Sequence, residues 1–113
     1  MLTESKAEET IVYNTEPATV AEACLKVLRE IGKITEESRQ TGTIAGKLSV
    51  NIYANPVYIN LRISKKGETT ELHIQTQRKE GLLTSGGAQK GLSSFLEKLG
   101  QEKNLSGAST AGW

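Results

Sequence analysis

The chain has 113 residues, of which 36% are hydrophobic, and fourteen Lys and Arg against thirteen acidic residues give it a formal net charge of +1. This length supports one domain, and the near-neutral charge argues against a dedicated nucleic-acid-binding module. Asp does not occur and Cys24 is the only cysteine, which excludes catalysis by aspartate, an intramolecular disulfide and a multi-cysteine zinc site. Because neither a signal peptide nor a membrane span is evident, we expect a cytoplasmic protein.

The first predicted elements are a strand and an amphipathic helix. Residues 10–14 are rich in β-branched and aromatic side chains, which predicts a strand after a flexible stretch over residues 1–9. Thr15 is expected to cap a helix that has Pro17 in its first turn and ends at Gly32. The apolar side chains of this helix recur at helical spacing and predict one buried face: Val20, Cys24, Val27, Leu28 and Ile31.

Four strands are predicted next, because the apolar period changes from helical to alternating after the first helix. Gly42, the pair 55–56 and the loop 65–68 divide this stretch. The predicted strands span residues 33–39, 43–54, 57–64 and 70–78.

A hairpin is predicted between the last two of these strands. If residues 65–68 form a four-residue loop, Leu61 faces Leu72 and Asn60 faces His73. Both faces of the hairpin then have matching partners, apolar on one side and polar on the other.

A second amphipathic helix is predicted to end at Gly100. Its apolar side consists of Leu92, Phe95, Leu96 and Leu99. Residues 101–113 show no periodicity and are rich in small and polar residues, which predicts a flexible tail. The chain is therefore interpreted as one domain over residues 10–100, between flexible ends at 1–9 and 101–113.

The predicted order of elements is β-α-β-β-β-β-α, which defines the fold class as α+β. The apolar sides of the two helices and the apolar face of the sheet are all buried if both helices pack on that face. The domain then has two layers, an antiparallel sheet and a pair of helices. The order resembles that of TATA-binding-protein-like and helix-grip folds. A double-stranded-RNA-binding domain has a cluster of basic residues at the start of its last helix. This sequence departs from that pattern, because residues 87–91 contain a single lysine.

The second face of the predicted sheet is polar and is the main candidate for binding a ligand or partner. Amide, imidazole and phenol groups donate and accept hydrogen bonds with a lower desolvation cost than full charges. The alternative is an ordinary solvated face whose tyrosines pack across strands. The candidate residues on this face are Asn51, Tyr53, Tyr58, Asn60, Arg62, His73 and Gln75.

His73 and the turn at residues 85–87 each have two interpretations, one as a functional site and one as an ordinary structural feature. His73 is the only side chain with an ordinary pKa suited to a general base near neutral pH, but no nucleophile or carboxylate is predicted beside it, which favours a hydrogen-bonded surface histidine. The turn Ser85, Gly86, Gly87 precedes a helix and forms a possible anion site, or an ordinary helix cap with turn glycines.

Three functional hypotheses follow from these residues. The first is a non-catalytic domain that binds a protein partner or small molecule on the polar face or in a pocket between sheet and helices, with self-association through the sheet as one version. The second is weak nucleic-acid binding through Tyr53, Tyr58, Arg62 and a basic rim, formed by Lys65, Lys66, Arg78 and Lys79 at one end of the hairpin. The third is an enzyme with His73 as base. No motif points to a cofactor, a metal or a membrane partner.

Overall fold

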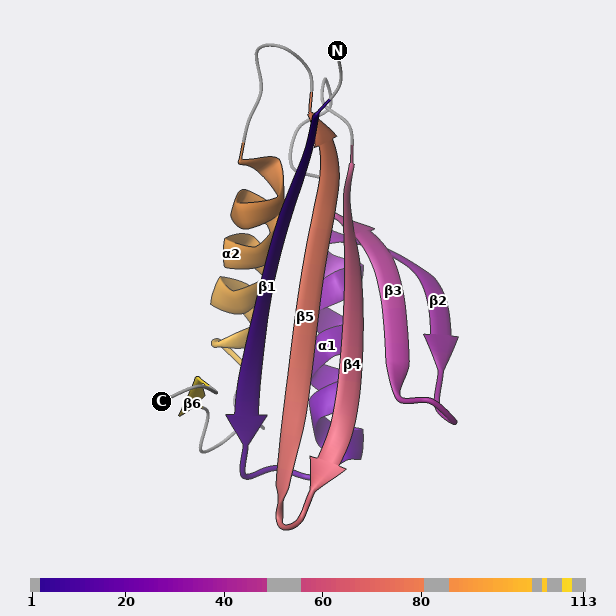
Figure 1. Ribbon diagram of the computed structural model, residues 1–113. Helices are drawn as coiled ribbons and strands as arrows, with labels where there is room; N and C mark the ends of the chain where they lie inside the picture. The colour runs from indigo at the N-terminus through magenta and orange to yellow at the C-terminus, as the bar shows by residue number, and fades with distance from the viewer. Residues whose placement is uncertain (1–2, 49–55, 81–85, 103–104, 106–108, 111–113) are drawn as a thin grey trace.

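An antiparallel sheet forms one layer of the molecule and two helices form the other (Figure 1). The computed structural model describes residues 3–48, 56–80, 86–102, 105 and 109–110. The strands lie side by side in the order β2-β3-β4-β5-β1-β6. The elements are β1 (Thr3–Tyr13), α1 (Pro17–Ile31), β2 (Gly32–Ser38), β3 (Thr43–Leu48), β4 (Val57–Lys66), β5 (Thr69–Glu80), α2 (Gly87–Leu99) and β6 (Ser109–Thr110).

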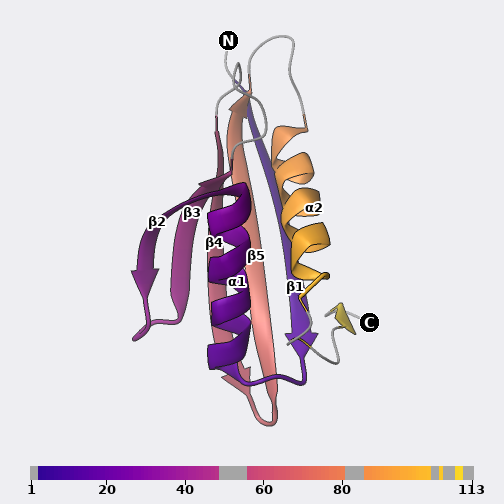
Figure 2. The same ribbon diagram turned by 180° about the vertical axis from the view of Figure 1, so that it is seen from behind.

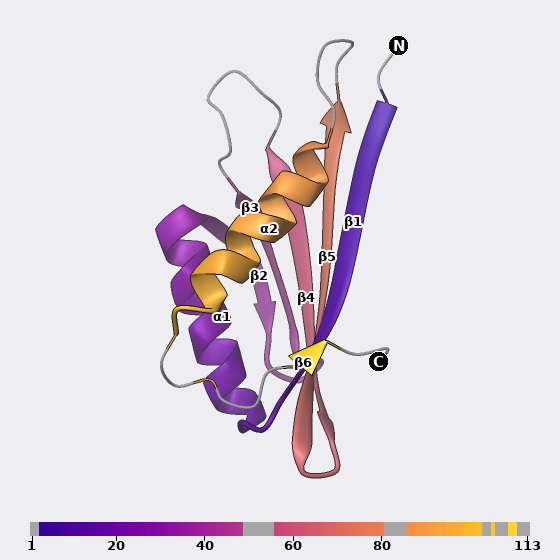
Figure 3. The ribbon, with the colours of Figure 1, turned by 90° about the vertical axis from the view of Figure 1, so that its left-hand side faces the viewer.

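Both helices cover the same face of the sheet, which confirms the predicted α+β class and its two layers (Figure 2; Figure 3). Helix α1 lies mainly over β2, β3 and β4, whereas α2 lies mainly over β5 and β1 and also contacts β4. Within the described part of the chain, the opposite face of the sheet carries no helix. The sheet therefore has a buried side and an outer face, as the alternating pattern predicts.

Strand β1 is much longer than the sequence indicates. It begins at Thr3 and pairs with β5 along its whole length, from Thr3 opposite Glu80 to Tyr13 opposite Thr70. The prediction that residues 3–9 belong to a flexible end was therefore wrong. Their polar composition hides the strand, because its stability comes from pairing with a distant segment and not from local propensity. At the other end of the chain, the short β6 pairs with β1 at Ile11 and Val12, within a stretch predicted as tail.

The β4–β5 hairpin has a tighter turn than predicted. Lys66 pairs with Thr69, which leaves Gly67 and Glu68 as a two-residue loop, and Gly67 has a φ of 64°. Glycine at the first central position of a two-residue loop favours a type II′ turn, whose backbone twist matches that of the flanking strands. The register is consequently shifted by two residues, so Leu61 faces Ile74 and not Leu72. A shift of two keeps every side chain on its predicted face.

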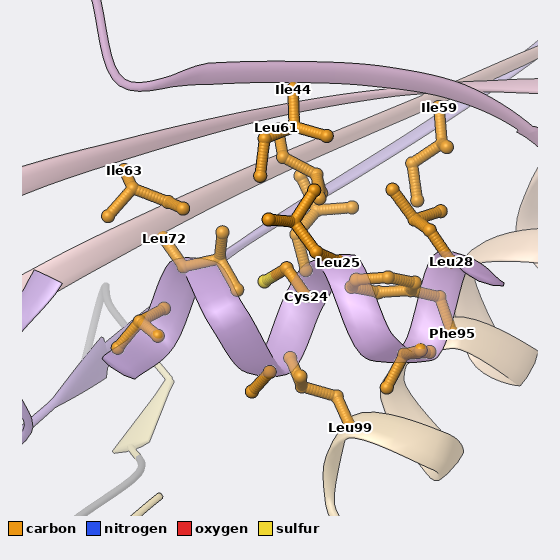
Figure 4. Close-up of a cluster of buried hydrophobic side chains, with 14 of the residues drawn as sticks. Cys24, Leu25, Leu28, Ile44, Ile59, Leu61, Ile63, Leu72, Phe95 and Leu99 are labelled. Carbon is orange, nitrogen blue, oxygen red and sulfur yellow. The ribbon is translucent and has the colours of Figure 1, made fainter. Parts of the chain in front are cut away.

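A continuous, mainly aliphatic core fills the space between the helices and the sheet (Figure 4). The predicted stripe of α1 is almost completely buried, with Val20, Cys24, Val27 and Leu28 at 0% exposure. Helix α2 contributes Leu92, Phe95 and Leu99, and the sheet contributes Ile44, Leu48, Val57, Ile59, Leu61, Ile63, Leu72 and Ile74. Gly91 lets α2 approach β4 closely, because a Cβ atom there would lie 2.8 Å from Cγ1 of Val57.

The helix ends agree with the sequence pattern except at one cap. Pro17 opens α1, Gly32 follows its last residue and Gly100 follows that of α2, as predicted. Thr15 does not cap α1, since Glu16 occupies that position without a side-chain hydrogen bond. The Thr15 carbonyl instead accepts a hydrogen bond from the Thr70 hydroxyl, which fastens the connection between β1 and α1 to the sheet.

Candidate functional site

The outer face of the sheet brings together polar side chains from two central strands, β4 and β5. Tyr58, Asn60 and Arg62 of β4 are exposed, and Gln75 of β5 is exposed beside half-buried His73. All five lie on the predicted face. Asn51 and Tyr53, the other two residues predicted there, lie outside the described residues.

His73 is held by two residues of β1 that the sequence pattern did not indicate. Its Nδ1 lies 2.9 Å from Oγ1 of Thr10, and its Nε2 lies 3.4 Å from a carboxylate oxygen of Glu8. In the tautomer with the proton on Nε2, the imidazole accepts the hydroxyl proton of Thr10 at Nδ1 and turns its N–H toward the Glu8 carboxylate. Neither residue entered the prediction, because Glu8 fell within the stretch expected to be flexible and no partner was predicted for the strand that begins at Thr10. The local signal is the alternation of charged and small side chains from Glu4 to Glu8.

The Thr10–His73–Glu8 cluster contains a hydroxyl, an imidazole and a carboxylate, which are the groups of a base-activated nucleophile. The cluster is, however, exposed to solvent. The side chains of His73 and Glu8 are 38% and 63% exposed. Catalytic clusters rely on exclusion of water to strengthen their electrostatic interactions. We therefore interpret these contacts as a tie between β1 and β5 that fixes the orientation of the His73 ring.

A polar pocket of about 410 Å³ lies on this outer face. Asn60, Arg62, His73 and Gln75 line it, so four of the predicted residues share one hollow. Tyr58 does not line it and lies beneath Lys47, whose Nζ is 5.6 Å from the centroid of its ring. The pocket also includes residues that were not predicted to bind: Glu36, Thr43, Ile44, Ala45 and Leu61.

A second pocket, of about 340 Å³, lies between α1 and the β2–β3 hairpin, on the helix side of the sheet. Its floor is apolar and its rim carries charged residues, among them Glu37 and Arg39, whose side chains approach to 4.0 Å. The residues lining it are Pro17, Ala18, Ala21, Glu22, Leu25, Glu37, Ser38, Arg39, Gly42, Thr43, Ile44 and Ile63.

The predicted basic rim does not form. Lys65 stands next to the β4–β5 turn, where its Nζ lies 3.8 Å from Glu16. Arg78 stands eight positions along β5 from Thr70, the partner of Lys65, and it is buried on the helix side. At about 3.3 Å per residue these positions are roughly 26 Å apart. The four-residue loop assumed earlier did not cause this error, because Lys65 and Arg78 lie at opposite ends of the hairpin in either register.

The proposed anion site at the start of α2 is already engaged in part. Gly86 is the N-terminal cap, with a φ of 72°, and Ser85 lies outside the described residues. The backbone N–H of Ala88 donates to Oγ of Ser5 at 3.1 Å, and the Thr76 hydroxyl donates to the Ala88 carbonyl at 2.7 Å. These bonds anchor the helix to β1 and β5, which favours the structural interpretation of the turn.

Within the described ranges, no three His, Cys or acidic residues are grouped as metal ligands would be. Neither helix there has the length and apolar character needed to cross a bilayer.

The geometry defines a class of fold in which an antiparallel sheet packs around helices on one of its faces. Two solved structures have this arrangement: CalU16 from Micromonospora echinospora (15% identity, 87% of this chain and 84% of that chain, TM-score 0.57) and Ara h 8.0201 (12% identity, 88% and 97%, TM-score 0.57). No protein-family model matches the sequence, and no curated protein matches it. The chain has the helix-grip, or Bet v1-like, fold, one of the two arrangements that the order of elements resembles.

Proposed function

We propose that this domain binds a small, largely apolar molecule in the pocket between α1 and the β2–β3 hairpin. The observation that carries the proposal is an open hollow with an apolar floor at the junction of helix and sheet. Its volume of about 340 Å³ falls within the range of small-molecule sites. Proteins of the helix-grip fold typically bind hydrophobic small ligands in a pocket, which supports the same class of ligand.

The lining of this pocket indicates what the ligand looks like. Ala21, Leu25 and Ile63 offer hydrocarbon to an apolar body, and burying that body removes apolar surface from water. Arg39 stands on the rim with a side chain that is 89% exposed. A guanidinium in this position can pair with a carboxylate or sulfonate at the end of the ligand. The expected ligand is therefore an apolar ring or chain with one anionic group.

The dye ANS, an anilinonaphthalene sulfonate, has this chemistry and tests the proposal. Its fluorescence should rise on addition of the native protein, with a Kd on the order of 10–100 μM for a partly open site. Ala21→Phe places a ring in the pocket and should abolish the increase. Glu30→Phe adds the same ring to an exposed position of α1 that does not line the pocket, and it should leave binding unchanged.

The charged rim has its own control. Arg39→Gln should weaken ANS several-fold and leave binding of a neutral naphthalene derivative unchanged, because only the sulfonate needs the guanidinium. Equal fluorescence of wild type and Ala21→Phe, with both shown by circular dichroism to be folded, would contradict this site.

A further inference from the structure

The polar pocket on the outer face contains two opposite charges that do not pair with each other. Arg62 reaches it from β4 and Glu36 from β2, and both side chains are exposed. Among the described residues, neither makes an ion pair or a side-chain hydrogen bond. By contrast, His73 at the same pocket already has both ring nitrogens engaged. The pocket thus offers one cation and one anion for external partners.

We propose that this pocket binds a small zwitterion of the α-amino-acid type, with its carboxylate on Arg62 and its ammonium group on Glu36. The strands that carry these residues are separated by β3, and Arg62 lies two positions along β4 from Asn60, the residue in line with Glu36, so the two Cα atoms are roughly 12 Å apart. Two charged hydrogen bonds of about 2.8 Å and the short span between the charges of an amino acid fit that separation when the two exposed side chains lean toward each other. A simple anion would satisfy Arg62 and leave Glu36 without a partner.

The remaining side chains of the pocket suit the rest of such a molecule. Ala45 lies between Glu36 and Asn60 in the pairing of β2, β3 and β4, and its small side chain leaves room between the two charges. Asn60 and Gln75 face each other across β4 and β5 and present amide donors and acceptors. They match a ligand side chain that carries an amide or a hydroxyl.

This site is separate from the proposed apolar one, because it opens on the other face of the sheet. Thr43 and Ile44 line both pockets and therefore cannot report on one alone. The backbone and side-chain amides of Asn60 and Gln75 belong only to the outer pocket. Each exposed ion pair contributes little, so the expected Kd lies in the millimolar range.

The test is a titration of the ¹⁵N-labelled protein with L-glutamine, followed by NMR. Saturable shifts are expected at Asn60 and Gln75. Arg62→Gln and Glu36→Gln should each weaken binding about fivefold. Lys47→Gln removes an outer-face cation that does not line the pocket, and it should leave the Kd unchanged.

Acetate and methylammonium, which each carry one half of the zwitterion, separate this site from a general charge effect. Each should bind at least tenfold more weakly than L-glutamine. Absence of shifts with L-glutamine, acetate binding as strong as that of the amino acid, or an unchanged Kd in both charge variants would overturn the proposal. Because ANS binding is measured independently, failure at one pocket leaves the result at the other intact.

Discussion

Two buried side chains, Cys24 and Tyr13, have ionisation properties that the core imposes on them. Burial raises the pKa of the Cys24 thiol from 9.0 to about 12. Burial, and to a smaller extent the charge of Cys24, raises the pKa of Tyr13 from 10.0 to about 12. The folded protein therefore keeps both protons at a pH where the unfolded chain has lost them. Stability linked to these groups is complete below about pH 9 and is lost as the pH rises toward 12.

We expect urea unfolding to show this loss directly. Between about pH 9 and pH 12 the Cys24 thiol alone should lower the free energy of unfolding by up to ~1.4 kcal/mol per pH unit. Cys24→Ala should reduce the pH slope, and Ser94→Ala on the exposed side of α2 should retain the wild-type slope. If wild type and Cys24→Ala lose stability equally over this range, the thiol is not the titrating group.

At the scale of single elements, alternation of apolar residues was a good guide to faces and a poor guide to registers. It placed Leu61 on the buried side and Arg62 on the outer side correctly. It did not determine which residue of β5 each one meets, because a shift of two leaves the pattern unchanged. That choice depends on the turn, where Gly67 permits a loop of two residues.

Gly67 is accordingly the residue on which the hairpin turn depends most. A Cβ atom there would meet nothing within 4 Å, so a substitution tests backbone conformation without a steric clash. Gly67→Ala should lower the free energy of unfolding by about 1–2 kcal/mol, because an L-residue is disfavoured at positive φ. Glu68→Ala, at the neighbouring loop position, should change stability by less than about 0.5 kcal/mol in the same urea titration. Equal effects of the two substitutions would argue against the strained turn.

At the scale of the whole molecule, the layers and the outer face could be predicted, whereas the residues that line the pockets could be predicted only in part. Helical and alternating periods determine which side chains are buried, and they indicated four residues of the polar pocket in advance. Glu36 was missed because its place depends on the pairing of β2 with β3, which contains a register irregularity between Ile34 and Glu36. The partners of His73 were missed because they come from β1, more than sixty residues earlier in the chain.

The position of β1 inside the sheet has a consequence for the way this chain is made. Its partners on β5 lie 57 to 77 residues later, from Thr70 for Tyr13 to Glu80 for Thr3. At about 5–20 residues per second, a ribosome needs roughly 3–15 s to supply them. Until β5 has been synthesised, β1 has no β5 to pair with, although α1 and the strands β2 to β4 are already made. The edge of β4 that pairs with β5 is also unpaired during this time. Ribosome-bound chains that stop before Thr69 should be cut rapidly by protease, and the released chain should resist. Equal resistance of the two would mean that the sheet forms without its central strand.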